Sequence, residues 1–165
     1  MQPFLGFLWC FVRVFIQAPS GRQRFNVLGA LHATSLQIIT FTNESYINSQ
    51  SVATLLQKIA SRFTDLPITI VLDNARYQRC HFIMNLATEL NIELLFLPPY
   101  SPNLNLIERL WRFVKLECLY STYYDTFDCF KQAISDCIDQ FHTTHKQSLT
   151  SLLTLNFQTF QIVTL

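Results

Sequence analysis

Two short apolar runs, separated by a segment with helical periodicity, constrain the fold of this chain more than any other feature. The runs are residues 68–72 and 92–97, and neither alternates much between polar and apolar side chains. Such runs are typical of strands buried on both faces. Between them, apolar residues follow helical spacing: Phe82, Ile83, Leu86, Ala87 and Leu90. We therefore predict a strand–helix–strand unit with two parallel strands and a right-handed crossover.

The segments on either side complete an α/β pattern. Residues 8–16, 25–33 and 36–42 are predicted strands, and the last two are close enough in sequence to pair antiparallel. A helix follows on Val52, Leu55, Leu56, Ile59, Ala60 and Phe63. Residues 104–117 form another predicted helix, and the last helix carries Phe127, Phe130, Ile134, Cys137, Ile138 and Phe141. This order resembles a ribonuclease H-like layout, with a mixed sheet flanked by helices.

Composition limits the chain to one domain, residues 1–165, with a substantial core. Half of the 165 residues are hydrophobic, and only 14% are charged. A net charge of +1 argues against a strongly basic protein, although local basic patches fit it. The five cysteines are odd in number, widely spaced and without a CxxC pair, which indicates reduced thiols in a cytosolic protein. No apolar run reaches the roughly 18 residues that a membrane span requires, so we expect no membrane association.

Each apolar run of the central unit leads to one carboxylate. Asp73 comes directly after the first run, and Glu108 follows the second run after a proline-rich turn, near the start of a helix. The carboxyl ends of parallel strands lie at one edge of a sheet, so both side chains are expected at that edge. Paired carboxylates there are suited to divalent-metal phosphoryl transfer, with Mg²⁺ or Mn²⁺ as the metal and two ions in a complete site.

The sequence segments around these two carboxylates resemble two conserved motifs of the DDE transposases, in the bacterial insertion-sequence branch of the mariner-like superfamily. They read VLDNARY at residues 71–77 and LPPYSPNLNLIERLW at residues 97–111. The resemblance extends from about Phe4 to the last helix. It implies a ribonuclease H-like fold, with Asp73 as the second catalytic acid and Glu108 as the third. The implied activity is metal-dependent cleavage of an element's terminal repeats and their joining to target DNA.

The same resemblance implies a cellular setting and several partners for the chain. The full-length protein is expected to act as a homodimer on DNA, in the bacterial cytoplasm at the nucleoid. Four further basic side chains and one amide are predicted to contact DNA: Asn74, Arg76, Arg109, Arg112 and Lys115.

The chain departs from the family pattern at its start. The family's first catalytic aspartate sits on the first strand, whereas no Asp or Glu precedes Glu44 here. We therefore expect that strand to lie just upstream of residues 1–7, and the helix-turn-helix region to be absent. Gln78 stands where His is common, and Leu106 replaces a usual Pro. The chain alone is expected to be inactive or very weak.

Other interpretations of the same residues remain open. Asp73 and Asn74 favour a turn, and Glu108 lies three residues after Asn105, as in a helix capping box. The basic residues after Glu108 also fit a solvated helix face. At the level of the whole chain, the alternative is a non-catalytic remnant, or a DNA-binding or dimerising fragment that modulates a full-length transposase. A nuclease of the same fold with another substrate is a third interpretation.

Overall fold

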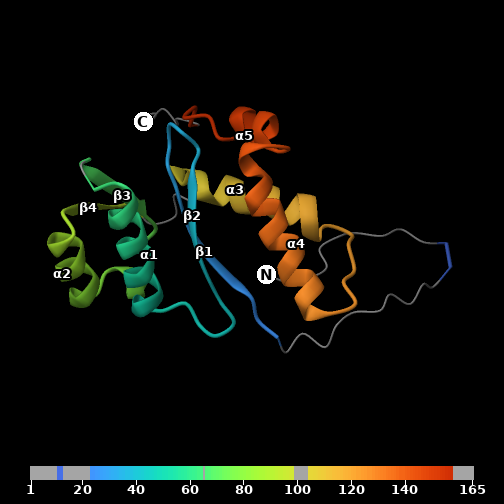
Figure 1. Ribbon diagram of the computed structural model, residues 1–165, viewed down its shortest axis with the longest axis horizontal. Helices are drawn as coiled ribbons and strands as arrows, with labels where there is room; N and C mark the ends of the chain where they lie inside the picture. Colours follow the sequence, from blue (N-terminus) through green and yellow to red (C-terminus); the bar gives the residue numbers. More distant parts are fainter. Residues whose placement is uncertain (1–10, 13–22, 65, 99–103, 158–165) are drawn as a thin grey trace, which may run out of the picture.

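A computed structural model describes residues 11–12, 23–64, 66–98 and 104–157 (Figure 1). It is an α/β structure whose elements follow the predicted ribonuclease H-like order. The elements are β1 (Asn26–Leu31), β2 (Ile38–Asn43), α1 (Ser49–Arg62), β3 (Ile68–Leu72), η1 (Arg76–Gln78), α2 (His81–Glu89), β4 (Ile92–Phe96), α3 (Leu106–Val114), the π-helical turn η3 (Lys115–Leu119), α4 (Phe127–Asp139), η4 (Gln140–His142) and α5 (Lys146–Leu152).

Strands β1 and β2 form an antiparallel hairpin, as predicted. The register runs from Asn26 opposite Asn43 to Leu31 opposite Ile38. Helix α3 packs against this hairpin at Gly29, where a Cβ atom would lie 2.8 Å from Cζ2 of Trp111. The absence of a side chain at Gly29 therefore allows the indole ring to approach the strand backbone closely.

Strands β3 and β4 pair in parallel, from Ile68 opposite Ile92 to Leu72 opposite Phe96, which confirms the predicted pairing. The prediction that both faces are buried is wrong. Burial alternates along each strand, and Val71 and Leu95 are 44% and 52% exposed. One face packs on α1 and α2, whereas no described element buries the other face. An apolar run alone cannot distinguish a strand covered on both faces from one covered on a single face.

The described strands form two separate two-stranded sheets, so the predicted single mixed sheet is not present in this part of the chain. Strand β1 pairs only with β2, and β3 pairs only with β4. The predicted strand at residues 8–16 lies outside the described residues, except for Phe11 and Val12, which form an exposed bend. Without a described strand between β1 and β3, each of these two strands keeps one unpaired edge.

Helix α1 connects the two sheets through a small hydrophobic core. The helix begins at a reciprocal capping box, in which the Asn48 side chain accepts from the Ser51 backbone N–H at 3.0 Å. The helix contacts β1, β2, α2 and η1, and the small core that it helps to form also includes side chains of β3 and β4. The fully buried members of this small core are Val52, Ala53, Leu56, Ile83, Ala87 and Ile92.

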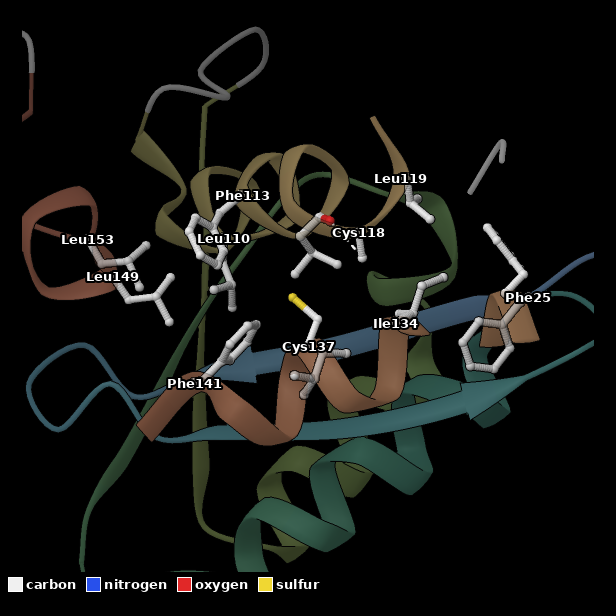
Figure 2. Close-up of a cluster of buried hydrophobic side chains, with 13 residues drawn as sticks. Phe25, Leu110, Phe113, Cys118, Leu119, Ile134, Cys137, Phe141, Leu149 and Leu153 are labelled. Carbon is white, nitrogen blue, oxygen red and sulfur yellow. Dashed lines mark hydrogen bonds between the residues drawn. The ribbon is translucent and has the colours of Figure 1, made fainter. Parts of the chain in front are cut away.

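A larger core lies between α3, η3, α4 and α5 (Figure 2). Leu110, Leu119 and Ile134 are fully buried at its centre. An ion pair between Lys131 on α4 and Glu44, 2.6 Å long, ties this half to the loop after β2. This core fixes α3, the helix that carries Glu108.

Two further features of the described residues bear on the sequence-based predictions about membrane spans and cysteines. No described helix has the length and apolarity needed to cross a bilayer. The described cysteines are all free: Cys118 and Cys137 are buried, Cys80 is half-buried and Cys129 is exposed, while Cys10 lies outside the described residues.

The contact at Gly29 leads to a test of the packing between β1 and α3. We expect Gly29→Ala to lower the free energy of unfolding by about 1–3 kcal/mol, because the new methyl group overlaps the Trp111 ring. Urea unfolding measures the change. Adding Trp111→Phe removes the ring atoms that the methyl group meets, so the double variant should lose less than the sum of the two single variants. Additive losses would contradict the contact.

Candidate active site

Asp73 lies at the carboxyl end of the parallel pair, as predicted. It follows Leu72, the last residue of β3, and its side chain is exposed. The neighbouring turn η1 brings Tyr77 close to it. Burial, together with the negative charge of Asp73, raises the pKa of the Tyr77 hydroxyl above its usual value. A phenol is already neutral at physiological pH, and the raised pKa makes loss of this proton still less favourable, so the Tyr77 hydroxyl remains a hydrogen-bond donor.

Asn74 joins the ends of the two strands. Its Nδ2 donates to the carbonyl oxygen of Leu97 at 2.6 Å, one residue beyond β4. The Leu97 N–H in turn donates to the carbonyl of Leu72 at 2.8 Å, which extends the strand pairing. Because Nδ2 faces a carbonyl, the orientation of the amide is fixed, and Oδ1 points elsewhere. Oδ1 is buried and accepts no hydrogen bond from the described residues.

Glu108 occupies the first turn of α3, with an exposed side chain. Asn105 caps this helix, because its side chain accepts from the Ile107 N–H at 3.3 Å. Among the described residues the Glu108 carboxylate accepts no hydrogen bond from the Asn105 N–H, so the capping-box interpretation is not supported. Residues 99–103, which contain Pro99 and Pro102 of the predicted turn, lie outside the described residues.

The predicted ligands match a hard divalent cation in their chemistry. Asp73 and Glu108 offer carboxylate oxygens, and the unpartnered Oδ1 of Asn74 offers a buried amide oxygen. Within the described ranges, however, no group of three or more His, Cys, Asp or Glu side chains lies close enough to hold a metal ion. The convergence of Asp73 and Glu108 on a shared metal therefore stays a prediction.

The predicted DNA-contacting cations differ in their surroundings. Arg76, Arg112 and Lys115 are exposed, and none of them forms an ion pair with a described acidic residue. Arg109 is instead engaged within the fold: its Nη1 and Nη2 donate to the carbonyls of Thr154 and Asn156, at 3.0 and 3.3 Å. Its guanidinium also lies over the Phe157 ring, 5.3 Å from the centroid. Arg109 thus fastens the segment after α5 onto α3.

Three residues in and directly after the η1 turn were not among the predicted site residues. Tyr77 lies near Asp73, and Gln78 is 6% exposed with an Oε1 that has no described partner. Arg79 places its guanidinium 4.9 Å from the ring centroid of Phe96, the last residue of β4. These residues belong to the segment DNARYQR, residues 73–79, but the sequence does not show that the folded turn places them near the ends of β3 and β4.

Comparison with known proteins identifies the family. Residues 12–131 match the family described as DDE superfamily endonuclease, and this match includes both Asp73 and Glu108. The chain belongs to that family. No curated protein matches the chain.

Solved structures include two similar chains. The catalytic core domain of BIV integrase is 18% identical, with a TM-score of 0.47, over 75% of this chain and 78% of that chain. A chain of the simian T-cell lymphotropic virus intasome, in complex with PP2A regulatory subunit B56 gamma, is 16% identical, with a TM-score of 0.46, over 87% of this chain and 54% of that chain.

The bond between Asn74 and Leu97 gives a test of how the strand ends are held. We expect Asn74→Ala to lower the free energy of unfolding by about 1–2 kcal/mol, because the Leu97 carbonyl loses its donor. Asn85→Ala, on the exposed face of α2, is the matched control and should change stability by less than about 0.5 kcal/mol. Equal effects of the two substitutions in urea unfolding would show that the bond is unimportant.

The contacts of Arg109 give a second test. Arg109→Ala removes both hydrogen bonds to the segment after α5, so backbone amides of residues 154–157 should exchange roughly tenfold faster. Hydrogen exchange followed by mass spectrometry measures this rate. Arg112→Ala, an exposed position on the same helix, should leave the exchange unchanged. Unaltered exchange in Arg109→Ala would refute the structural role.

Proposed function

We propose that this chain is the catalytic-core portion of an insertion-sequence transposase, with metal-dependent DNA cleavage and strand transfer as its chemistry. The observation that carries the proposal is the family match across residues 12–131, which includes the segments around Asp73 and Glu108. The proline-rich motif from Leu97 to Trp111 supports assigning the chain to the bacterial insertion-sequence branch. The partners would be the element's terminal repeats and target DNA, with a homodimer as the working form in the bacterial cytoplasm.

In this proposal Asp73 and Glu108 hold Mg²⁺ or Mn²⁺ through their carboxylate oxygens. The bound ions would supply activation of water or of a 3′ hydroxyl, and charge neutralisation at the phosphate. Asn74 fixes the ends of β3 and β4 and so positions the backbone that carries Asp73. Tyr77, whose hydroxyl pKa is raised by burial and by the charge of Asp73, keeps a hydrogen-bond donor near that carboxylate.

The exposed cations would hold the DNA strand. Arg76 follows Asp73 by three residues, whereas Arg112 and Lys115 follow Glu108 along the same helical segment. Because no described acid pairs with them, their charges are available to phosphates. Arg109, also predicted to contact DNA, has its guanidinium engaged with the Thr154 and Asn156 carbonyls. We therefore give Arg109 only a secondary part in DNA binding.

A second candidate is a non-catalytic fragment that binds DNA or dimerises with a full-length transposase. It is favoured by the observation that the described residues bring together no group of three potential metal ligands. The two candidates differ in what they require of Asp73. Metal binding and cleavage need its carboxylate, whereas DNA binding or assembly without metal does not.

Metal binding provides the first test of the proposed function. Asp73→Asn and Glu108→Gln should each weaken Mn²⁺ binding by roughly tenfold, about 1.4 kcal/mol, because each removes one anionic ligand. Titration followed by electron paramagnetic resonance measures free Mn²⁺. Asp139→Asn and Glu89→Gln, exposed acids elsewhere on the surface, serve as controls and should bind as the wild type does. Unchanged binding in the first pair would rule out the proposed metal site.

DNA cleavage provides the second test. The chain alone is expected to nick a supercoiled plasmid very weakly or not at all in Mg²⁺, since only two of the family's three acids are assigned here. Strong nicking that disappears in Asp73→Ala would overturn the expected inactivity and establish the enzyme. Both candidates are expected to nick little or not at all, so an absence of nicking does not separate them. If DNA binding persists while Mn²⁺ binding is unchanged in Asp73→Asn and Glu108→Gln, the non-catalytic candidate is correct.

A further inference from the structure

We propose that Arg79, stacked on Phe96, forms with Arg76 a binding site for the phosphate backbone of DNA beside Asp73. This inference rests on the proposed function, because it takes DNA as the partner. It adds a residue that the sequence-based predictions left out, and it assigns the ligand class as phosphodiester oxygens, without base readout.

The first observation is the position of the Arg79 guanidinium. It lies 4.9 Å from the ring centroid of Phe96, which is the residue paired with Leu72 in the parallel register. Asp73 follows Leu72 directly. The ring therefore holds the guanidinium at the carboxyl ends of both strands, the edge on which the proposed metal ligand Asp73 lies.

The second observation is that the N–H donors and the charge of the Arg79 guanidinium are available to a ligand. A guanidinium stacked on an aromatic face keeps its N–H donors at the edge of its plane, where they can bind a phosphate in bidentate fashion. Arg79 is exposed, and among the described residues the only ion pairs are those of Lys131 with Glu44 and Asp128. The charge of Arg79 is thus not neutralised by a described carboxylate.

The third observation is the geometry of the η1 turn. Arg76 opens this 3₁₀ turn and Arg79 is the residue that caps its carboxyl end, with the Arg79 N–H donating to the Arg76 carbonyl at 3.2 Å. Two exposed arginines therefore flank one short turn that follows Asp73. Two guanidiniums on one turn offer several N–H donors to successive phosphates of a DNA strand.

Preorganisation separates Arg79 from Arg76, Arg112 and Lys115, the exposed cations predicted to contact DNA, because none of these three lies over a described aromatic ring. A long side chain that is free in solution loses rotamer entropy when it binds, about 1.5–2 kcal/mol for Arg. The stack on Phe96 has already restricted Arg79 before DNA arrives. We therefore expect Arg79 to contribute more to backbone binding than Arg76, which has no described aromatic contact.

The test is fluorescence anisotropy with a labelled DNA duplex, in EDTA and over a range of salt concentrations. Arg79→Ala should weaken binding roughly five- to tenfold at low salt and reduce the salt-dependence slope by about one. Arg62→Ala removes an exposed arginine at the end of α1 that forms no ion pair with a described acid, and it should leave affinity unchanged. Phe96→Leu keeps the charge but loses the ring, so it should weaken binding roughly two- to threefold and preserve the slope.

The outcomes separate this inference from the proposed function. Equal affinity of Arg79→Ala and Arg62→Ala, or no DNA binding by the wild type at low salt, would overturn the inference. Competition by inorganic phosphate at concentrations similar to those of DNA phosphate would also overturn it, because the site would then hold a single anion. If Mn²⁺ binding is insensitive to Asp73 and Glu108 while Arg79→Ala still weakens DNA binding, the catalytic proposal fails and this site stands.

Discussion

Helix α1 is the element on which the rest of this structure depends, because the two strand pairs share no hydrogen bonds with each other in the described chain. Its buried residues share one hydrophobic core with Leu28 of β1 and with Ile68 and Ile70 of β3. Hydrophobic contact through one helix therefore sets the relative placement of the hairpin and the parallel pair. The position of Asp73 at the end of β3 follows from that packing, and so do the contacts of the η1 turn.

The candidate site contains two buried side-chain amide oxygens that have no described hydrogen-bond donor. Asn74 is committed to the backbone through Nδ2, yet its Oδ1 is buried without a described partner. Gln78 likewise buries an unpartnered Oε1 four residues later. Buried amide oxygens without donors are costly in a stable fold. Their concentration next to Asp73 is consistent with an edge that is completed by another polar group, such as a cation, a water molecule or further polypeptide.

The sequence predicted local features of the fold well and long-range features poorly. The apolar periodicity predicted α1, β3, α2 and β4 correctly. Asn105, considered as a helix cap in the non-catalytic interpretation of Glu108, does cap α3. The exposure of Val71 and Leu95 was not predicted, because an apolar side chain in a strand does not indicate whether another element covers its face of the sheet. The engagement of Arg109 by Thr154 and Asn156 joins positions 45 and 47 residues apart, which spacing within a helix cannot reveal. The stack of Arg79 on Phe96 was invisible for the same reason.

The division of the interior into two cores has a consequence for how the chain folds. Every residue of the smaller core and its packed neighbours lies between Leu28 and Leu94, whereas the larger core joins Phe25 to Leu153. Closing the longer loop costs more chain entropy, so contacts within the smaller core form with less loss of conformational freedom. The edge that carries Asp73 therefore belongs to the part of the molecule with the shorter-range contacts, and the helix that carries Glu108 belongs to the part with the longer-range ones.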